Sequence, residues 1–278
     1  MNGTMLGASS TYYREEMIFR GSVSRVMGTF LEMLIMGREE NLCLSVWKEV
    51  CSILARDEGA LDRFDASSEV SGINRALKSA GRFDGVSDLV AGILRECLRY
   101  RSLTGGLFDV TRKDMSALSL DGRALASTDR SIDLDFGGFA KGWALKEIRE
   151  ILDDAGIDTA FIDFGGSALM ALGSQPGGDG WRIDLPSPYD GAALASFVLK
   201  DNALSTSGNT PGYAGHIIDP RDGRVEVRKM LSTVVSGDPV DAEVLSTALM
   251  IAGTGDTEML RRAFPDAEFG RYLLSHED

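Results

Sequence analysis

Two adjacent glycines followed by a lysine stand at the start of a predicted helix. Gly137 and Gly138 end a short alternating run that begins at Asp133, and helical spacing starts directly after them. Adjacent glycines let backbone N–H groups approach an anion, and a helix start adds its positive dipole end. Lys141 would add a mobile positive charge that the dipole does not favour there. The pattern indicates a phosphate site. The alternative is a tight turn with a solvated lysine, because the spacing matches neither a Walker loop nor the dinucleotide fingerprint.

Residues 133–166 are predicted to form a unit of strand, glycine turn, helix and strand. The helix stops at Gly156, and the second strand runs to the pair Gly165-Gly166. The apolar positions of the predicted helix recur at helical spacing and are Ala140, Ala144, Leu145, Ile148, Ile151 and Leu152. This unit would hold the glycine pair between two strands of a sheet.

The chain before this unit is predicted to contain two strands and three helices. Residues 17–37 carry the bulky and β-branched residues of strands, interrupted at Met27-Gly28-Thr29. Gly28 marks a bulge, a close approach to a ligand or only an irregular strand. The predicted helices cover residues 39–64, residues 67–74 and a segment that begins at the cap Ser87. Thr104-Gly105-Gly106 then forms either a turn or a ligand loop.

The chain after the unit is predicted to be mostly sheet, followed by two helices. Short apolar runs separated by Gly, Pro, Ser and Asp are typical of strands. The predicted strands are residues 169–173, 181–185, 194–199, 203–206, 232–236 and 267–274, with another strand from Gly215 into an Asp-Pro turn at Asp219. The predicted helices cover residues 240–253 and 257–263. No repeat or low-complexity linker is present.

Composition restricts the class of partner. The chain has 278 residues, 44% of them hydrophobic, which is enough for a substantial core. Its formal net charge of −13 argues against a nucleic-acid or anionic-membrane surface, where a basic face is expected. If the chain binds a polyphosphate, a metal ion would mediate. His216 and His276 are the only histidines, which excludes a histidine-rich zinc site.

The cysteines and the N-terminus carry no signal for export. Cys43, Cys51 and Cys97 lack metal-ligand spacing and lie on apolar helix faces, so reduced core thiols are expected. No basic and apolar leader is present, and no stretch is long enough to span a bilayer. We therefore expect a cytoplasmic form, or a chain trimmed of its leader, with residues 1–16 as a flexible tail and residues 17–278 as a single domain.

Taken in order, the motifs resemble the ApbE family of FAD:protein FMN transferases. The matching segments are Met27-Gly28-Thr29, Ser68-Glu69, Ile73-Asn74, residues 104–109, residues 133–142, residues 163–166, residues 205–208, residues 216–220 and residues 245–249. They cover nearly the whole chain after residue 20. The resemblance implies an α+β fold with a β-rich body and flanking helices, T-fold-like and unlike a Rossmann domain.

The resemblance also implies the activity. Members of the family cleave the pyrophosphate of FAD, place FMN on a Thr or Ser hydroxyl of a target flavoprotein and release AMP, with Mg²⁺ as cofactor. This is phosphoryl transfer, so the site must neutralise the pyrophosphate, orient a hydroxyl and accept its proton.

The family's metal site implies three ligands in this chain. The hydroxyl ligand falls on Thr247, and four residues earlier, where the family usually has Asp, this chain has Glu243. Two oxygen donors at i and i+4 share a helix face. Gly138 is expected to supply the carbonyl. The added methylene of Glu would shift either the metal or the helix. Asp241 is an alternative that lies off this face, and Glu243 could also be a solvated helix charge.

The resemblance assigns roles to further residues. His216 would receive the nucleophile's proton or stabilise the phosphate, for which a pKa near 6.5 is suited. Without the resemblance, His216 would be read as a structural strand residue. Lys141 would contact a phosphate. The residues expected to line the FAD pockets are Met27, Asn74, Thr104, Gly137, Gly138, Asp163, Gly165, Ser207 and Gly208. Lys146 departs from the family, where an Asp is common.

Two other functions fit the same residues. An FAD pyrophosphatase would use water in place of the protein hydroxyl, and a non-catalytic FAD-binding protein would hold the flavin without turnover. The nearest match to the family's acceptor motif is Asp84-Gly85-Val86-Ser87-Asp88, which lacks the Thr. The sequence therefore favours a transferase over a transferase substrate.

Overall fold

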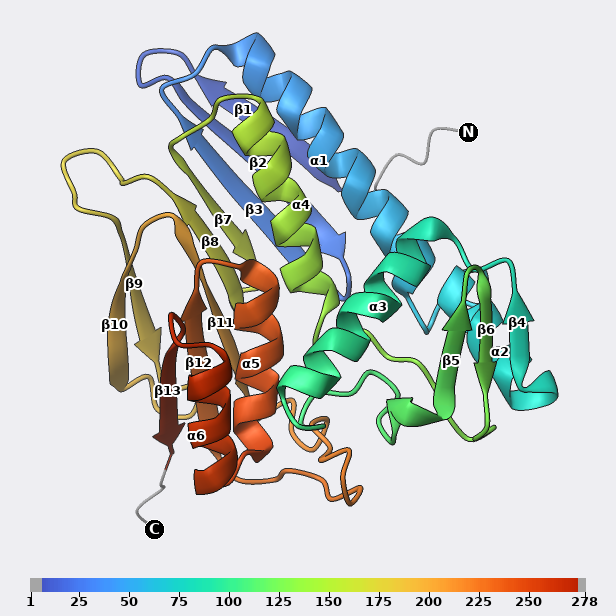
Figure 1. The fold of residues 1–278 in the computed structure, drawn as a ribbon. Coiled ribbons are helices and arrows are strands. Elements are labelled where there is room, and N and C mark those ends of the chain that lie inside the picture. The colour runs from blue at the N-terminus through green and yellow to red at the C-terminus, as the bar shows by residue number, and fades with distance from the viewer. Residues whose placement is uncertain (1–6, 275–278) are drawn as a thin grey trace.

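The structure is a computed structural model and describes residues 7–274. Its body is an eight-stranded sheet in the order β1-β2-β3-β7-β8-β11-β12-β13, with every pairing antiparallel (Figure 1). The strands are β1 Ala8–Tyr13, β2 Ile18–Val26, β3 Thr29–Met36, β7 Ala160–Phe164, β8 Ala168–Leu172, β11 Asn202–Gly208, β12 Met230–Ser236 and β13 Glu268–Leu273.

Helices cover one face of this sheet, and a hairpin covers part of the other (Figure 1). The covering helices are α1 Glu40–Leu61, α4 Ala140–Asp154, α5 Pro239–Ile251 and α6 Thr254–Ala263. Alternation along the strands divides the apolar side chains, so that Ile162 packs with α1 and α4 while Phe161 stacks on Trp181 of the hairpin, with ring centroids 5.2 Å apart. The hairpin strands are β9 Trp181–Pro186 and β10 Ala193–Leu199.

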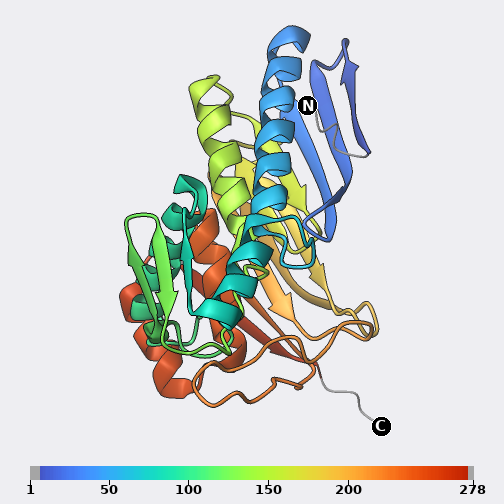
Figure 2. The same cartoon turned by 90° about the vertical axis from the view of Figure 1, so that its right-hand side faces the viewer.

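A smaller layer lies at one end of the body (Figure 2). It contains α2 Glu69–Ala80, α3 Asp88–Leu103, the short 3₁₀ helix Met115–Ala117 and a three-stranded sheet in the order β4-β6-β5. These strands are β4 Arg82–Asp84, β5 Leu118–Asp121 and β6 Ala124–Ser127. They were not predicted, because they are short and mostly half-buried or exposed.

The predicted fold class is confirmed. The structure is a mixed α+β fold with a β-rich body and flanking helices. A Rossmann domain would need parallel strands joined by crossover helices, whereas the strand pairs of the described residues are antiparallel.

The expected flexible tail is wrong for residues 8–13. These residues form β1, which pairs with β2 from Ala8 opposite Val23 to Tyr13 opposite Ile18. The rest of the expected tail that precedes Gly7 lies outside the described residues. The segment Ala8–Tyr13 is almost entirely exposed, so it carries no hydrophobic alternation, and backbone pairing with β2 makes it a strand.

Three other predicted elements differ from the structure. Residues 133–136 form no strand, because Leu134 pairs with the Asn74 side chain and not with a neighbouring strand. The helix predicted over residues 67–74 begins after the cap Ser68 and continues to Ala80, where Gly81 ends it in a left-handed conformation. Residues 215–219 lie in a loop with a single bridge between Ile218 and Val225.

The interruption at residues 27–28 is a hairpin turn. Met27 and Gly28 both have positive φ, at 48° and 76°, and Val26 pairs with Thr29 across them. This two-residue connection matches the twist of the strands it joins. The turn is fixed from outside by Glu58 of α1, whose carboxylate accepts the Met27 N–H at 2.8 Å.

The three cysteines are free, with Cys43 and Cys97 buried and Cys51 half-buried. Burial raises the pKa of the Cys97 thiol well above its usual value, which makes this thiol unreactive. Within residues 7–274, no helix combines the length and apolar character needed to cross a bilayer.

A buried carboxyl group lies between α1 and α4. Asp57 is fully buried, and its Oδ1 accepts from Arg56 at 2.6 Å, while Arg56 also binds Glu147 of α4 at 2.6 Å. Burial, and then the neighbouring Glu147 carboxylate, raise the pKa of Asp57 to about 7. A proton on Asp57 therefore favours the folded chain.

We expect Asp57→Asn to remove a pH dependence of stability. The pKa of Asp57 is higher in the folded chain than in the unfolded chain. The contribution of Asp57 to the free energy of unfolding is therefore complete below about pH 4. It falls by up to about 4 kcal/mol as the pH rises through about 7. Urea unfolding at several pH values measures this. The exposed Asp154→Asn is the control, and an unchanged pH profile in Asp57→Asn would contradict the prediction.

Candidate active site

The glycine turn before α4 faces the helix α5. A Cβ atom on Gly138 would lie 3.2 Å from the hydroxyl oxygen of Thr247. A Cβ atom on Gly142 would lie 2.7 Å from both the Glu243 Cβ and the Pro239 carbonyl oxygen. Glycine at these positions lets the two helices approach closely. The contact brings Gly138, Glu243 and Thr247, the three predicted metal ligands, to one place.

Lys141 and Glu243 form an ion pair across this helix contact. The Glu243 side chain is 5% exposed and the Lys141 side chain 17%, so the pair is largely withdrawn from water. The second Glu243 oxygen accepts from the Ser205 hydroxyl at 2.8 Å. A buried carboxylate is stable only with a cation and hydrogen bonds around it, and both are present here. Glu243 is therefore not a solvated helix charge.

A group of hydroxyls supports Glu243 and Thr247. Ser205 and Ser207 stand two residues apart on β11, so both side chains point to the same side of the strand. The Ser246 hydroxyl lies 3.0 Å from the Ser205 hydroxyl and 2.8 Å from the Ser207 hydroxyl. The Ser207 hydroxyl lies 3.3 Å from that of Thr247. Each hydroxyl both donates and accepts, so the group fixes the side chains along this face of α5.

Asp241, the alternative ligand, points elsewhere. Its carboxylate accepts from the Tyr100 hydroxyl at 2.6 Å, on the side of α3. Burial raises the pKa of Asp241. Lys146 also serves a structural contact, since it lies 3.2 Å from Asp238, the residue that caps α5.

His216 lies in the long loop between β11 and β12. Its ring stacks on Tyr213, with centroids 4.0 Å apart. Nδ1 is buried without a hydrogen-bond partner in the part of the chain that the structure describes. Burial lowers the pKa of His216, and the nearby charges of Arg112 and Lys141 lower it further. The neutral imidazole, which can accept a proton, is therefore favoured at neutral pH.

Asn209 holds the loop that carries His216. It is 1% exposed, and its amide donates to the carbonyls of Glu226 and Arg228 at 3.0 and 2.9 Å, while its oxygen accepts from Gly215 at 3.1 Å. Sequence reasoning missed this residue, because the contacts join backbone groups that are distant along the chain. Its place directly after the Ser-Gly pair of β11 gave no separate signal.

The side chains of Asn74 and Thr104 form hydrogen bonds with backbone groups. Asn74 donates to the Leu134 carbonyl at 3.1 Å and accepts its N–H at 2.8 Å, which fixes the segment that leads to the glycine turn. Thr104 is fully buried, accepts the Phe108 N–H at 3.1 Å and donates to Tyr100. Their side-chain groups are used internally, so any ligand contact here would come from neighbouring backbone. Their assignment to the FAD pocket stays a prediction.

Met27, Asp163 and Gly165 meet at one end of the sheet. β3 begins where the antiparallel β7 ends, which brings the Met27 turn beside Gly165. A Cβ on Gly165 would lie 2.5 Å from the Thr29 hydroxyl oxygen, and its φ is +70°. Asp163 accepts the Gly166 N–H at 2.7 Å, and burial raises its pKa. Their ligand contacts, and those of Gly137 and Gly208, also stay predictions.

Two arginines border the glycine segment and were not predicted. Arg63 binds both Asp133 and Asp135 at 2.8 Å. Arg112 has a positive φ of 56°, and its guanidinium lies 3.6 Å from the Asp135 carboxylate. The charge of Arg112 also lowers the pKa of His216. Asp135 in turn accepts the Gly137 N–H at 3.0 Å. The ion pairs therefore tie Arg112, whose charge acts on His216, to the glycine turn.

We expect Gly142→Ala to destabilise the chain by about 1–3 kcal/mol, because the new methyl group has no room between α4 and α5. Urea unfolding measures the change in the free energy of unfolding. Gly92→Ala in α3 is the matched control, since no atom lies within 4 Å of its Cβ position and a gain of about 0.5–1 kcal/mol is expected there. Equal stability of the two variants would contradict the close helix contact.

The donor set at Gly138, Glu243 and Thr247 suits a hard cation. It consists of a carbonyl, a carboxylate and a hydroxyl, and oxygen ligands of these kinds bind Mg²⁺. Glu243 is buried and needs a positive partner, which Lys141 supplies in this structure. Within residues 7–274, no group of three or more His, Cys, Asp and Glu side chains is placed to hold a metal. The only carboxylate of the donor set named above is that of Glu243.

A family model and several known proteins are similar to this chain. The ApbE family model matches residues 27–119 and 112–268. The FAD:protein FMN transferase of Rhodobacter capsulatus is 31% identical over 202 residues, which are 66% of this chain and 38% of that protein's length. The FAD:protein FMN transferase of Vibrio cholerae is 24% identical over 245 residues, 74% of this chain and 72% of that protein.

Solved structures share the fold. The flavin transferase ApbE from Vibrio cholerae has a TM-score of 0.75 at 22% identity, covering 96% of this chain and 98% of that one. The ApbE protein from Thermotoga maritima has a TM-score of 0.76 at 19% identity, covering 94% and 93%. At these identities the structures establish the fold alone. With the family model matching most of its length, the chain belongs to the ApbE family.

Proposed function

We propose that this chain is an FAD:protein FMN transferase. It would transfer FMN from FAD to a Thr or Ser hydroxyl of a target flavoprotein and release AMP, with Mg²⁺ as cofactor. The observation that supports this most is the convergence of Gly138, Lys141, Glu243 and Thr247 at the contact of α4 and α5. The names of the relatives support the same activity.

The reaction is a phosphoryl transfer at the FMN phosphorus. The bond between the acceptor oxygen and this phosphorus forms, the bond from the phosphorus to the bridging oxygen breaks, and AMP leaves with that oxygen. His216 is the proposed acceptor of the hydroxyl proton, because its pKa is lowered and its neutral form prevails at neutral pH. Lys141 is the proposed phosphate contact, since it stands in the first turn of α4 directly after the glycine turn, with its side chain 17% exposed.

Glu243, Thr247 and the Gly138 carbonyl are the proposed ligands of Mg²⁺. When bound, the ion would neutralise charge on the pyrophosphate. Ser205 and Ser246 hold Glu243 in place, and the close contact at Gly142 fixes the distance between the two helices. These contacts would hold the proposed ligands in position before the substrate binds. Positioning, together with electrostatic stabilisation, supplies most of the catalysis in phosphoryl transfer.

The release of AMP and FMN from FAD tests this proposal. Purified protein is incubated with FAD, with and without Mg²⁺ and with and without an acceptor peptide that carries a Thr, and the products are separated by chromatography. The proposal requires AMP release that depends on Mg²⁺ and on the acceptor. Free FMN and AMP without acceptor would identify a pyrophosphatase, and bound FAD without AMP would identify a binding protein.

A further inference from the structure

His216 has no hydrogen bond that fixes the direction of its ring. Nδ1 is buried, and it has no hydrogen-bond partner among residues 7–274, which leaves Nε2 as the nitrogen that can meet a hydroxyl. A histidine that works as a base is usually oriented through the nitrogen that does not react, by a carboxylate or a backbone carbonyl. Another contact therefore has to orient this ring.

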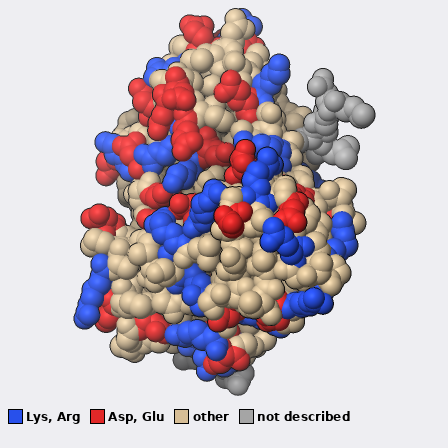
Figure 3. All heavy atoms as spheres, turned by 45° about the vertical axis from the view of Figure 1, so that its right-hand side comes forward, with Lys and Arg blue, Asp and Glu red and all other residues tan. Residues whose placement is uncertain are grey.

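The charged groups next to His216 are cations. Burial, and then the charges of Arg112 and Lys141, lower the pKa of His216. Guanidinium and ammonium groups only donate, so neither can accept the N–H of an imidazole. Figure 3 shows Lys and Arg side chains gathered across the middle of one face, so positive regions exist on a chain of net charge −13. A positive neighbourhood keeps the ring neutral and leaves its direction open.

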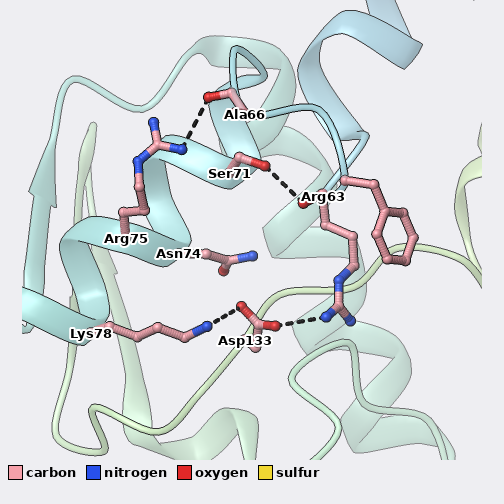
Figure 4. A pocket seen from close by; sticks show the side chains of 8 residues that line it. Arg63, Ala66, Ser71, Asn74, Arg75, Lys78 and Asp133 are labelled. Carbon is pink, nitrogen blue, oxygen red and sulfur yellow. Dashed lines mark hydrogen bonds and ion pairs between the residues drawn. The ribbon is translucent and has the colours of Figure 1, made fainter.

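The carboxylates beside Arg112 are already paired. Asp135 lies 3.6 Å from Arg112 and 2.8 Å from Arg63. Figure 4 shows Arg63 also reaching Asp133, which Lys78 contacts at 2.9 Å. Both carboxylates therefore serve cations. The histidine–carboxylate pair that orients many catalytic histidines is not formed by Nδ1 with any residue that the structure describes.

The ring of Tyr213 is the group that contacts the imidazole. The two ring centroids lie 4.0 Å apart and the ring planes differ by 27°, so the rings stack. Tyr213 is 64% exposed, so the contact covers one face of His216 and adds little to the core. In the described part of the chain the Tyr213 hydroxyl forms no hydrogen bond. The ring face is therefore the part of Tyr213 that acts on His216.

The backbone of the loop places the two rings together. Thr210 and Tyr213 exchange backbone hydrogen bonds of 3.0 and 3.1 Å across the Pro-Gly pair between them, which closes a tight turn. Gly215 has a positive φ of 73°, and its N–H donates to the buried Asn209 side chain at 3.1 Å. The turn fixes Tyr213, and the left-handed Gly215 lets the chain fold back so that His216 lies over it.

We propose that Tyr213 is a positioning residue for FMN transfer, whose ring face, in place of a hydrogen bond to Nδ1, holds the His216 imidazole with Nε2 towards the acceptor hydroxyl. The role in transfer rests on the proposed function, in which His216 accepts the hydroxyl proton. The ring contact itself does not depend on that function.

NMR of the histidine side chains tests the ring contact in the full chain without FAD. His216 and His276 are the only histidines, so the spectrum of His276→Ala assigns the His216 signals. The ring current of a stacked tyrosine shifts the carbon-bound ring protons of His216 upfield. We expect Tyr213→Leu to abolish this shift and Tyr213→Phe to keep it. Tyr13→Leu, at an exposed tyrosine of β1, should leave it unchanged.

Steady-state kinetics of FMN transfer test the role of the contact. We expect Tyr213→Leu to lower kcat about 10- to 100-fold and to change KM for FAD less than about threefold, because a small displacement of a reacting group costs up to about 100-fold. Tyr213→Phe should stay within about threefold of the unaltered chain, since it keeps the ring face. The acid limb of the rate should move to higher pH in Tyr213→Leu, because uncovering the imidazole removes part of the burial that lowers the pKa of His216.

Three results would overturn the proposal. An unchanged His216 shift in Tyr213→Leu would show that the rings do not stack in solution. A changed shift with the kcat and acid limb of the unaltered chain would show that the stack does not serve the reaction. An equal loss of rate in Tyr213→Phe and Tyr213→Leu would assign the role to the hydroxyl.

The two measurements separate this proposal from the proposed function. The NMR experiment contains no FAD, so it is independent of transferase activity. A chain that shows the upfield shift and never transfers FMN would contradict the proposed function, and with it the role of Tyr213 in transfer, while the ring contact would stand.

Discussion

Replacing His216 by alanine is expected to lower the rate of FMN transfer by about 100- to 10,000-fold, the range that general acid–base groups contribute. His216 is the proposed proton acceptor, and its burial beside Arg112 and Lys141 keeps it neutral. The measurement is kcat/KM for FMN transfer at neutral pH. His276→Ala is the matched control, because His276 is the only other histidine of the chain.

The same variant should change the pH profile. Because burial, and then the charges of Arg112 and Lys141, lower the pKa of His216, its neutral form prevails at neutral pH, and the rate should fall as the pH drops below the usual histidine range. This acid limb should disappear in His216→Ala. A variant that keeps both the rate, within threefold, and the acid limb would show that another group accepts the proton.

Replacing Glu243 by glutamine is expected to lower FMN transfer by about 100-fold or more, as expected for loss of a preorganised charged group. Gln keeps the size of the side chain and an oxygen that can accept from Ser205, but it removes the charge that Lys141 neutralises. The measurement is the rate as a function of Mg²⁺ concentration. We expect a weaker response to the ion as well as a lower maximum.

Two further variants make this result specific. Glu258→Gln, at an exposed position on α6, should leave the rate and the Mg²⁺ response unchanged. Glu243→Asp places the family's usual residue at the site and should retain Mg²⁺-dependent activity. If Glu243→Gln transferred FMN with the Mg²⁺ response of the unaltered chain, the metal assignment would be wrong.

Most helices and the strands of the central sheet could be predicted, because their hydrophobic periodicity records which face is buried. The clearest case is α4, whose apolar positions recur at helical spacing and pack on the sheet. Strand β1 could not be predicted in this way, because its side chains are exposed and only its backbone pairs. The small sheet at β4 to β6 escaped prediction for a similar reason.

The segment at residues 133–136 shows how a correct pattern can give a wrong element. Leu134 and Phe136 are buried, while Asp133 and Asp135 face the other way and bind Arg63. This alternation is that of a strand, but the backbone of Leu134 pairs with the Asn74 side chain, and the Asp135 N–H donates to the Val110 carbonyl in a loop. A period of two reports alternate burial and does not identify the hydrogen-bond partner.

The i, i+4 spacing predicted that Glu243 and Thr247 share a face, because this depends only on helix geometry. The ion pair of Glu243 with Lys141 could not be predicted, since it depends on where α4 and α5 touch, and that is decided by the close fit at Gly142. The approach of Arg112 to His216 depends likewise on two loops far apart in the sequence.

The measurement that tests the central claim most directly is covalent transfer of FMN to a protein. The chain is incubated with FAD, Mg²⁺ and a flavoprotein domain that carries an acceptor Thr, the mixture is denatured, and the acceptor is analysed by mass spectrometry beside a Thr→Ala acceptor. The account predicts an acceptor heavier by one FMN phosphoester, with one AMP released per transfer and no change in the Thr→Ala protein. An acceptor of unchanged mass, while FAD is bound or hydrolysed, would contradict it.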